Sequence, residues 1–194
     1  DIVIDDGGTT TSQQGLSSDR DTLTISNEST LTRANTAVNV TANEVSVTVN
    51  SGSTIITSSA DKAIFANDVE DLTVTNSGTL NATRGKTIDI KGTTNATITN
   101  NSGGIISAAK NTIPTSGTGS NSTTGYNIVN SGTIYASNGT NSAIYTSNTT
   151  SSGNITNKSE GDIYSLGSQA TIKLGASSTL TNSGSIRNKL DTDN

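Results

Sequence analysis

The chain has 194 residues and a formal net charge of −5, and Ser, Thr and Asn account for 88 of its positions. Cysteine and histidine are absent, which excludes disulfide frameworks, thiolate metal sites and catalytic groups that depend on either residue. The eleven Lys and Arg residues are scattered along an acidic chain, a pattern that argues against nucleic-acid binding.

The chain begins with DIVIDD (1–6), followed by the polar stretch GGTTTSQQG (7–15). Alternation predicts one strand with Ile2 and Ile4 on one face and Val3 on the other, carried on a flexible tether that ends at residue 20. Such a strand either folds back as a cap or adds to the sheet of a neighbouring subunit. Position 1 is not Met, which predicts a processed, secreted chain. No stretch approaches the ~20 apolar residues of a membrane span.

Residues 21–188 repeat with a period of roughly 25 positions. One aliphatic series follows Asn-Ser-Gly-like corners: Leu31, Ile55, Leu80, Ile105, Ile134, Ile163 and Ile186. A second series runs in phase with it: Val38, Ile64, Ile88, Ile113, Ile144 and Ile172. A third strand precedes each corner, as in LTVTN (72–76) and ATITN (96–100). This pattern predicts one all-β domain over 1–194, a right-handed parallel β-helix of about seven coils with three short strands per coil and a polar tail at 189–194.

The recurrent Asn-Ser-Gly is interpreted as a corner between two strands. Asn and Gly adopt positive φ at the lowest cost, so they suit a bend that returns on every coil. The corner asparagines are then expected to stack along the axis as a hydrogen-bonded ladder. The predicted ladder consists of Asn50, Asn76, Asn101, Asn130 and Asn182.

The repeats TNSGTL (75–80), VNSGTI (129–134) and TNSGSI (181–186), with DTLTISNESTL (21–31), resemble the passenger regions of bacterial autotransporters, the type V secreted surface proteins. The resemblance covers residues 21–188. It implies a β-helix fold and a place at a cell surface, in a family that includes adhesins, aggregation factors, proteases and toxins. The long membrane-embedded β-barrel of that family has no counterpart in this sequence.

The few aromatic residues give the candidate binding site. With Ile134 and Ile163 inward, alternation places Tyr135 and Tyr164 outward at equivalent positions of adjacent coils, and Ile106 at the same position one coil earlier. Such a strip is a docking surface for a partner protein or a sugar. The alternative is that these side chains only cover the strands beneath them.

Candidate catalytic or metal-binding residues are sparse, and we predict neither a catalytic group nor a metal or cofactor. The densest acidic cluster is Asp68, Glu70 and Asp71, close to Asp61 and Lys62. We interpret it as a solvated corner, with weak Ca²⁺ binding or a carboxylate pair of a polysaccharide-active enzyme as alternatives.

Thr alternation in TLTI (22–25) and TVT (73–75) is typical of ice-binding β-helices, which need a flat and regular Thr array. From the sequence the Thr positions do not hold register between coils, so no such array is expected. The sequence thus predicts a secreted, non-enzymatic structural or adhesive protein of a cell surface. Its predicted partner is a surface or glycan receptor, or the chain itself in a head-to-tail filament that uses residues 2–4.

Overall fold

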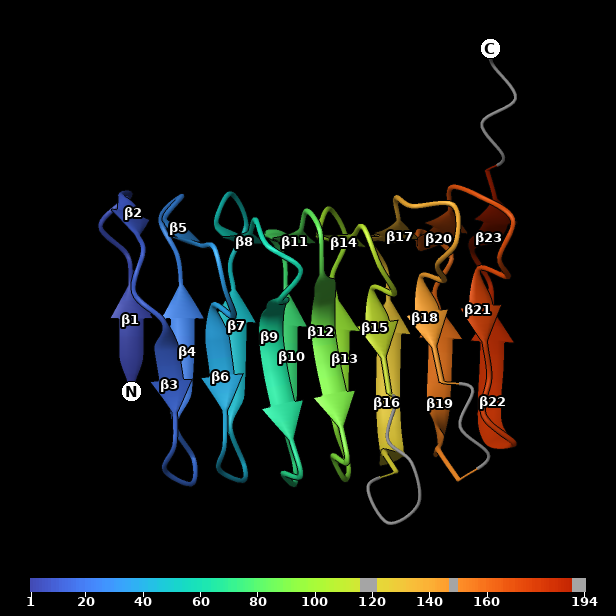
Figure 1. Cartoon of the computed structure of the whole chain (residues 1–194), viewed down its shortest axis with the longest axis horizontal. Coiled ribbons are helices and arrows are strands. Elements are labelled where there is room, and N and C mark those ends of the chain that lie inside the picture. The colour runs from blue at the N-terminus through green and yellow to red at the C-terminus, as the bar shows by residue number, and fades with distance from the viewer. Residues whose placement is uncertain (116–121, 147–149, 190–194) are drawn as a thin grey trace.

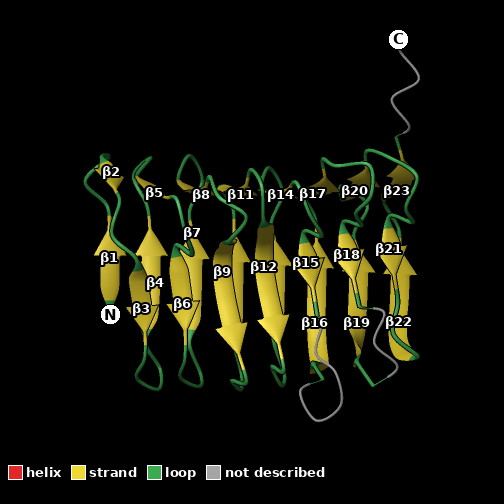
Figure 2. Ribbon diagram, in the orientation of Figure 1, coloured by secondary structure: helices red, strands yellow, loops and turns green. Residues whose placement is uncertain are grey.

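The computed structural model describes residues 1–115, 122–146 and 150–189 of the chain (Figure 1). Every regular element in these ranges is a β-strand, and no helix occurs among them (Figure 2). Each strand pairs in parallel with the equivalent strand of the neighbouring coil. The predicted all-β parallel solenoid is therefore confirmed.

Three walls of stacked strands surround the core. Sheet A consists of β1 (Ile2–Ile4), β4 (Thr22–Ile25), β7 (Ser46–Val49), β10 (Thr73–Asn76), β13 (Thr97–Asn100), β16 (Thr124–Asn130), β19 (Ser152–Asn157) and β22 (Ser177–Asn182). Sheet B consists of β2 (Thr9–Thr10), β5 (Thr30–Arg33), β8 (Thr54–Thr57), β11 (Thr79–Ala82), β14 (Ile105–Ala108), β17 (Thr133–Ala136), β20 (Asp162–Ser165) and β23 (Ser185–Asn188).

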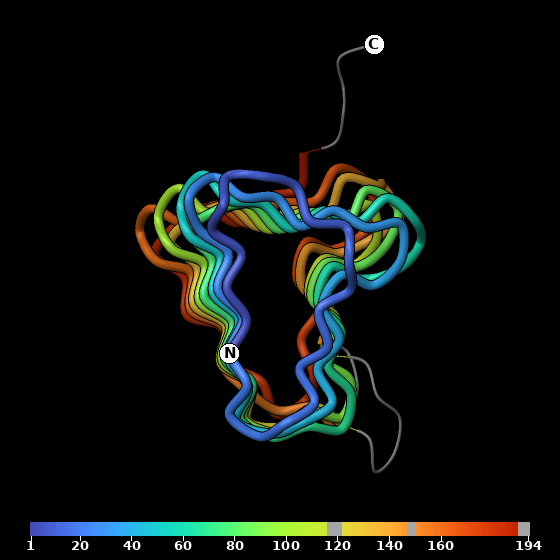
Figure 3. Tube along the Cα trace, turned by 90° about the vertical axis from the view of Figure 1, so that its left-hand side faces the viewer, coloured from blue at the N-terminus to red at the C-terminus, as the bar shows by residue number. Residues whose placement is uncertain are grey.

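The third wall is made of two shorter sheets in line. The first contains β3 (Gln14–Leu16), β6 (Val38–Val40), β9 (Lys62–Asn67) and β12 (Lys86–Lys91). The second contains β15 (Ile113–Pro114), β18 (Ile144–Tyr145) and β21 (Ile172–Lys173). The Ile88 amide donates a 3.0 Å hydrogen bond to the Thr112 carbonyl, which joins the two sheets. Viewed from the N-terminal end, the chain turns clockwise as it recedes, so the coil is right-handed (Figure 3).

The first coil begins at the N-terminus itself. Ile2–Ile4 pair with Leu23–Ile25, and β2 and β3 of the same coil pair with β5 and β6. We predicted a strand on a flexible tether for residues 1–20. The structure shows instead that these residues form a complete coil. At the other end, residues 190–194 of the predicted polar tail lie outside the described residues.

The core runs through the centre of the coil as rows of aliphatic side chains. Val74, Ile98 and Ile128 lie in one such row, in register on neighbouring strands, and all are fully buried. The second predicted aliphatic series is confirmed, because its members are aligned by strand pairing on the third wall. The first series is correct except in the fifth coil, where Ile105 faces outward.

A row of buried asparagines lies at the corner between sheets A and B. Its members are Asn76, Asn100, Asn130, Asn157 and, at the exposed end, Asn182. Each Nδ2 donates to the Oδ1 of the asparagine on the next coil, at 2.8 to 2.9 Å. A ladder was predicted, but two of its members were wrong. Val49 holds the position expected for Asn50, and Asn101 lies one residue past the ladder position.

The expected positive φ is found at long corners, where Gly52 and Gly103 of the Asn-Ser-Gly motif both have φ of 79°. At the short corner Asn130 and Gly132 do not have positive φ, and there the glycine is required by close stacking. A Cβ on Gly132 would lie 2.3 Å from the Gly104 carbonyl oxygen and 2.7 Å from Nδ2 of Asn100. Similar contacts below 3.0 Å surround the other glycines of this row, which are Gly78, Gly104, Gly161 and Gly184. The absent side chain therefore leaves space for the ladder of the preceding coil.

The corner has two lengths. In the short form the ladder amide of Asn76 donates to the carbonyl of Gly78, two positions later. In the long form the amide of Asn100 donates to the carbonyl of Gly104, four positions later. The two extra residues form a turn closed by a hydrogen bond from the Gly104 amide to the Asn101 carbonyl. Both forms return the next strand with the same face inward.

Substituting Asn100 by Ala is expected to cost far more stability than substituting its neighbour Asn101. The Asn100 side chain donates to oxygens of Gly104, Asn130 and Thr133 and accepts from Asn76. Its loss removes these bonds and leaves the buried Oδ1 of Asn130 without a donor, at about 1–3 kcal/mol for an unpaired buried group. The side chain of Asn101 makes one hydrogen bond, to Ser77 Oγ, and its loss should cost about 1 kcal/mol or less. Thermal unfolding followed by circular dichroism measures both. Equal costs would contradict the ladder register.

Candidate functional site

The predicted aromatic strip lies on the outer face of sheet B. Tyr135 on β17 and Tyr164 on β20 occupy equivalent positions, and both side chains are half-buried. Their rings stack with centroids 4.9 Å apart and an angle of 5° between the ring planes. The structure therefore brings these two candidate residues together.

Ile106, the third predicted member of the strip, is not part of it. Its side chain is fully buried, in register with Leu80 and Ile134. The residue that precedes Tyr135 in the outward row is Ser107, and Ile105 is the exposed aliphatic residue of this strand. The reason is that the ladder residue before β14 is Asn100 and not Asn101, so the inward position after this long corner is residue 106 and not residue 105.

Charged side chains continue the strip beyond Tyr164. Arg187 on β23 forms an ion pair with Asp162, and its guanidinium lies 5.7 Å from the Tyr164 ring centre. The Lys189 ammonium lies 4.1 Å from the same ring centre. Burial raises the pKa of Tyr164, with further increases from Tyr135 and Asp162 and an opposing effect of Arg187. Tyr164 is thus held in its neutral, hydrogen-bonding form.

This arrangement favours contact through ring edges and hydroxyl groups. The faces of the Tyr164 ring are next to Tyr135 and Lys189, so they are not free for stacking on a ligand. The tyrosine hydroxyls and the Arg187–Asp162 pair offer donors and acceptors on the same outer face. Arg187 was not singled out from the sequence, although alternation from Ile186 places it outward beside Tyr164 when β20 pairs with β23.

The N-terminal strand does not have the role expected for a free donor strand. Ile4 is buried and Ile2 half-buried in the first coil, whereas Val3 points outward and is 60% exposed. The strand pairs with β4 along one edge, so it forms the first strand of its own sheet A.

The acidic cluster lies at the corner between β9 and β10. Asp68 and Asp71 have positive φ, and Asp71 accepts a 3.2 Å hydrogen bond from the Asn95 amide of the next coil. Burial would raise the pKa of Asp61, but hydrogen bonds from Thr36 and Lys62 lower it below the usual value. Among the described residues, no three acidic side chains are arranged to hold a metal ion.

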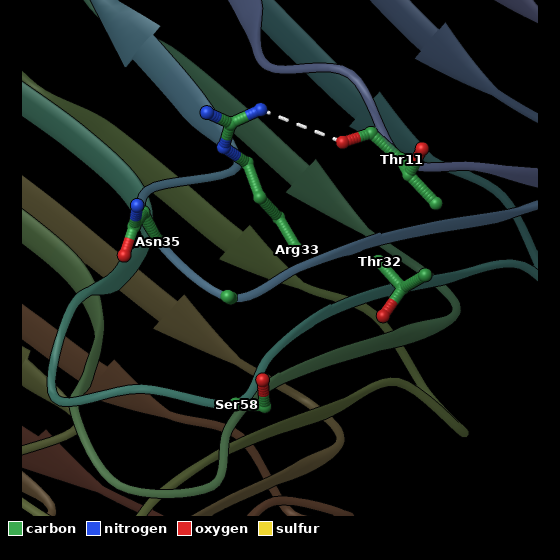
Figure 4. Close-up of a pocket in the computed structure, with 6 residues that line it drawn as sticks. Thr11, Thr32, Arg33, Asn35 and Ser58 are labelled. Atoms are coloured by element: carbon green, nitrogen blue, oxygen red, sulfur yellow. Dashed lines mark hydrogen bonds between the residues drawn. The ribbon is translucent and has the colours of Figure 1, made fainter.

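A shallow pocket of about 370 Å³ opens near the end of β5 (Figure 4). It is lined by Thr11, Thr32, Arg33, Ala34, Asn35 and Ser58. Nη1 of Arg33 donates a 3.4 Å hydrogen bond to the Thr11 carbonyl. The lining contains no carboxylate, so the pocket lacks an acid–base pair for glycoside chemistry. The sequence did not single out this site.

No protein-family model, curated protein sequence or solved structure matches this chain. Within the described ranges there is also no helix of the length and apolar character needed to cross a membrane.

Proposed function

We propose that the chain is a secreted, non-enzymatic β-helical protein of a cell surface, and that the strip of Tyr135 and Tyr164 is its adhesive contact. The stacked, half-buried tyrosine pair is the observation that carries this proposal. Aromatic side chains with one polar end are favoured at contact surfaces, because they bury apolar area while retaining a hydrogen-bonding group.

The proposed ligand is a glycan receptor. Sugar hydroxyls both donate and accept hydrogen bonds, and Asp162, Arg187 and the tyrosine hydroxyls supply the complementary groups. The resemblance of the Asn-Ser-Gly repeats to autotransporter passengers supports export by the type V route.

Two alternatives from the sequence remain predictions. A head-to-tail filament would have to join whole coils, because Ile2–Ile4 are already paired with β4. A polysaccharide-active enzyme would have to use the corner of Asp68, Glu70 and Asp71, where Asp71 is hydrogen-bonded to Asn95. Neither alternative is favoured by a contact among the described residues.

Replacing Tyr135 and Tyr164 together by Ser is expected to abolish binding to immobilised glycans and to intact cells. The lost stack should lower the free energy of unfolding by only about 0.5–1.5 kcal/mol, so the coil stays folded. Binding is measured on a glycan array and folding by circular dichroism.

Phe65→Ser is the matched control for this experiment. Phe65 is a half-buried aromatic residue on the third wall, with Lys62 Nζ 4.7 Å from its ring centre. The Phe65→Ser substitution therefore removes a similar aromatic group from another face of the coil. This variant should bind like the wild type. Glycan or cell binding that survives in the double tyrosine variant would refute the proposed contact.

A further inference from the structure

The outer face of sheet A carries two parallel rows of mostly hydroxyl side chains, interrupted at Asn127, Asn154 and Val129. The first row contains Thr22, Ser46, Thr73, Thr97, Asn127, Asn154 and Thr179. The second contains Thr24, Thr48, Thr75, Thr99, Val129, Thr156 and Thr181. On β4, β7, β10 and β13 every outward position is Thr apart from Ser46. The expectation that Thr positions lose register between coils is therefore wrong.

Backbone pairing fixes the rows as a two-dimensional grid. Thr73 pairs with Thr97, and Thr75 with Thr99, in an uninterrupted parallel register. Neighbouring strands lie about 4.8 Å apart, and outward residues two positions apart on one strand lie about 6.6 Å apart. The strands of successive coils follow nearly the same path along this wall (Figure 3).

The grid is uncharged and its central hydroxyls are unused by the protein. In the described part of the chain, the hydroxyls of Thr24, Thr48, Thr75 and Thr99 make no hydrogen bond, and their side chains are half-buried. From β4 to β22 no outward position of the two rows is charged. Sheet B differs, because its outward rows include the charged residues Asp162 and Arg187.

We propose that this face binds ice. A regular grid of hydroxyls and methyl groups can order a first layer of water at a fixed repeat, as the surface of an ice crystal does. Thr is stiff at χ1, and its backbone here is fixed by the sheet, so little freedom is lost when that water layer orders.

The chemistry of the face favours ice over a second protein surface. Stable protein interfaces have apolar, aromatic-rich centres, and burying this grid against a protein would leave its hydroxyls unpaired. Among the outward positions of β4, β7, β10 and β13 none is aromatic or aliphatic. Ice offers a donor or acceptor to every hydroxyl and demands the periodicity that the sheet supplies.

The test is thermal hysteresis, the gap between melting and freezing of a single ice crystal, measured with the full chain. The wild type is expected to show hysteresis and to partition into growing ice. Thr75→Tyr, which places a bulky ring at the centre of the grid, should lose most of both. Thr79→Tyr is the matched control, because Thr79 lies outward in the same coil but on sheet B, and it should behave like the wild type.

A second variant is designed to gain activity. Asn127→Thr with Val129→Thr extends both rows onto β16, so the hysteresis should increase. A wild-type chain that neither shows hysteresis nor partitions into ice overturns the proposal. So does a wild-type dimer in sedimentation that Thr75→Tyr converts to monomer, since a second copy would then occupy the face. This test does not involve Tyr135 or Tyr164, so the glycan proposal can fail independently.

Discussion

Replacing Ile134 by Asp is expected to unfold the coil. Ile134 is fully buried and lies in register between Ile106 and Ile163 in the core. Losing its apolar burial costs about 1.5–3 kcal/mol, and a carboxyl group without a partner in the core adds several more. The sum approaches the whole stability of an ordinary domain, about 5–15 kcal/mol. Far-UV circular dichroism should show loss of sheet signal and of cooperative unfolding.

Two variants serve as controls for this prediction. Ile134→Val keeps the site apolar and should cost about 0.5–1.5 kcal/mol. Tyr135→Ser changes the adjacent residue on the opposite face and should cost about 1 kcal/mol, the value of its ring stack. If Ile134→Asp and Tyr135→Ser destabilise the chain equally, the inward and outward assignment of β17 is wrong.

Gly132→Ala is expected to be strongly destabilising, although it adds only one methyl group. The new Cβ would lie 2.3 Å from the Gly104 carbonyl oxygen and 2.5 Å from the Asn101 carbonyl oxygen. Both atoms belong to the backbone of the preceding coil, so they can move only if the two coils separate at the corner. Overpacking of this kind costs about 3 kcal/mol or more, which a shift of the thermal midpoint would reveal.

Gly15→Ala is the matched control. Gly15 is in β3, does not have positive φ, and a Cβ there would meet no heavy atom within 4 Å. The substitution should leave stability unchanged or raise it by about 0.4–1 kcal/mol, through the unfolded chain. A Gly132→Ala protein as stable as Gly15→Ala would contradict the close-stacking explanation of the corner glycines.

Most of the fold could be predicted from the sequence, because the aliphatic residues recur with the period of the coil. Ile64, Ile88 and their equivalents recur at nearly constant intervals, and strand pairing aligns them as the intervals predict. A narrow core accepts only small apolar side chains at fixed places, so its period survives in a chain dominated by Ser, Thr and Asn.

The register was harder to predict than the period. Asn-Ser-Gly at 101–103 matches the motif, yet the ladder residue is Asn100. A short and a long corner share the same letters, and only the hydrogen bonds between coils distinguish them. The misplacement of Ile106 followed from this ambiguity. The Thr grid was missed for a related reason, because its rows become regular only when each coil is aligned on the residue before the corner.

The first coil was missed because it lacks the aliphatic series and the Asn-Ser-Gly motif that identify the other coils. Leu16 is the only fully buried aliphatic residue in residues 1–20, and Gly7 and Gly8 stand where later coils have Asn-Ser-Gly. Its strands are recognised by their partners: β1 by β4 and β3 by β6. The tyrosine pair was predictable, since alternation from Ile134 and Ile163 is enough to place Tyr135 and Tyr164 outward.

The two corner lengths differ by an even number of residues, so both keep the same face of the following strand toward the core. Asn76 and Leu80 are separated by two residues fewer than Asn100 and Ile106, and both pairs face the core. An insertion of two residues at this corner therefore leaves the inward and outward positions of all following strands unchanged. An insertion of one residue would turn the next strand over and place its aliphatic side chain in solvent and its Thr in the core. Length variation at this corner is thus restricted to pairs of residues.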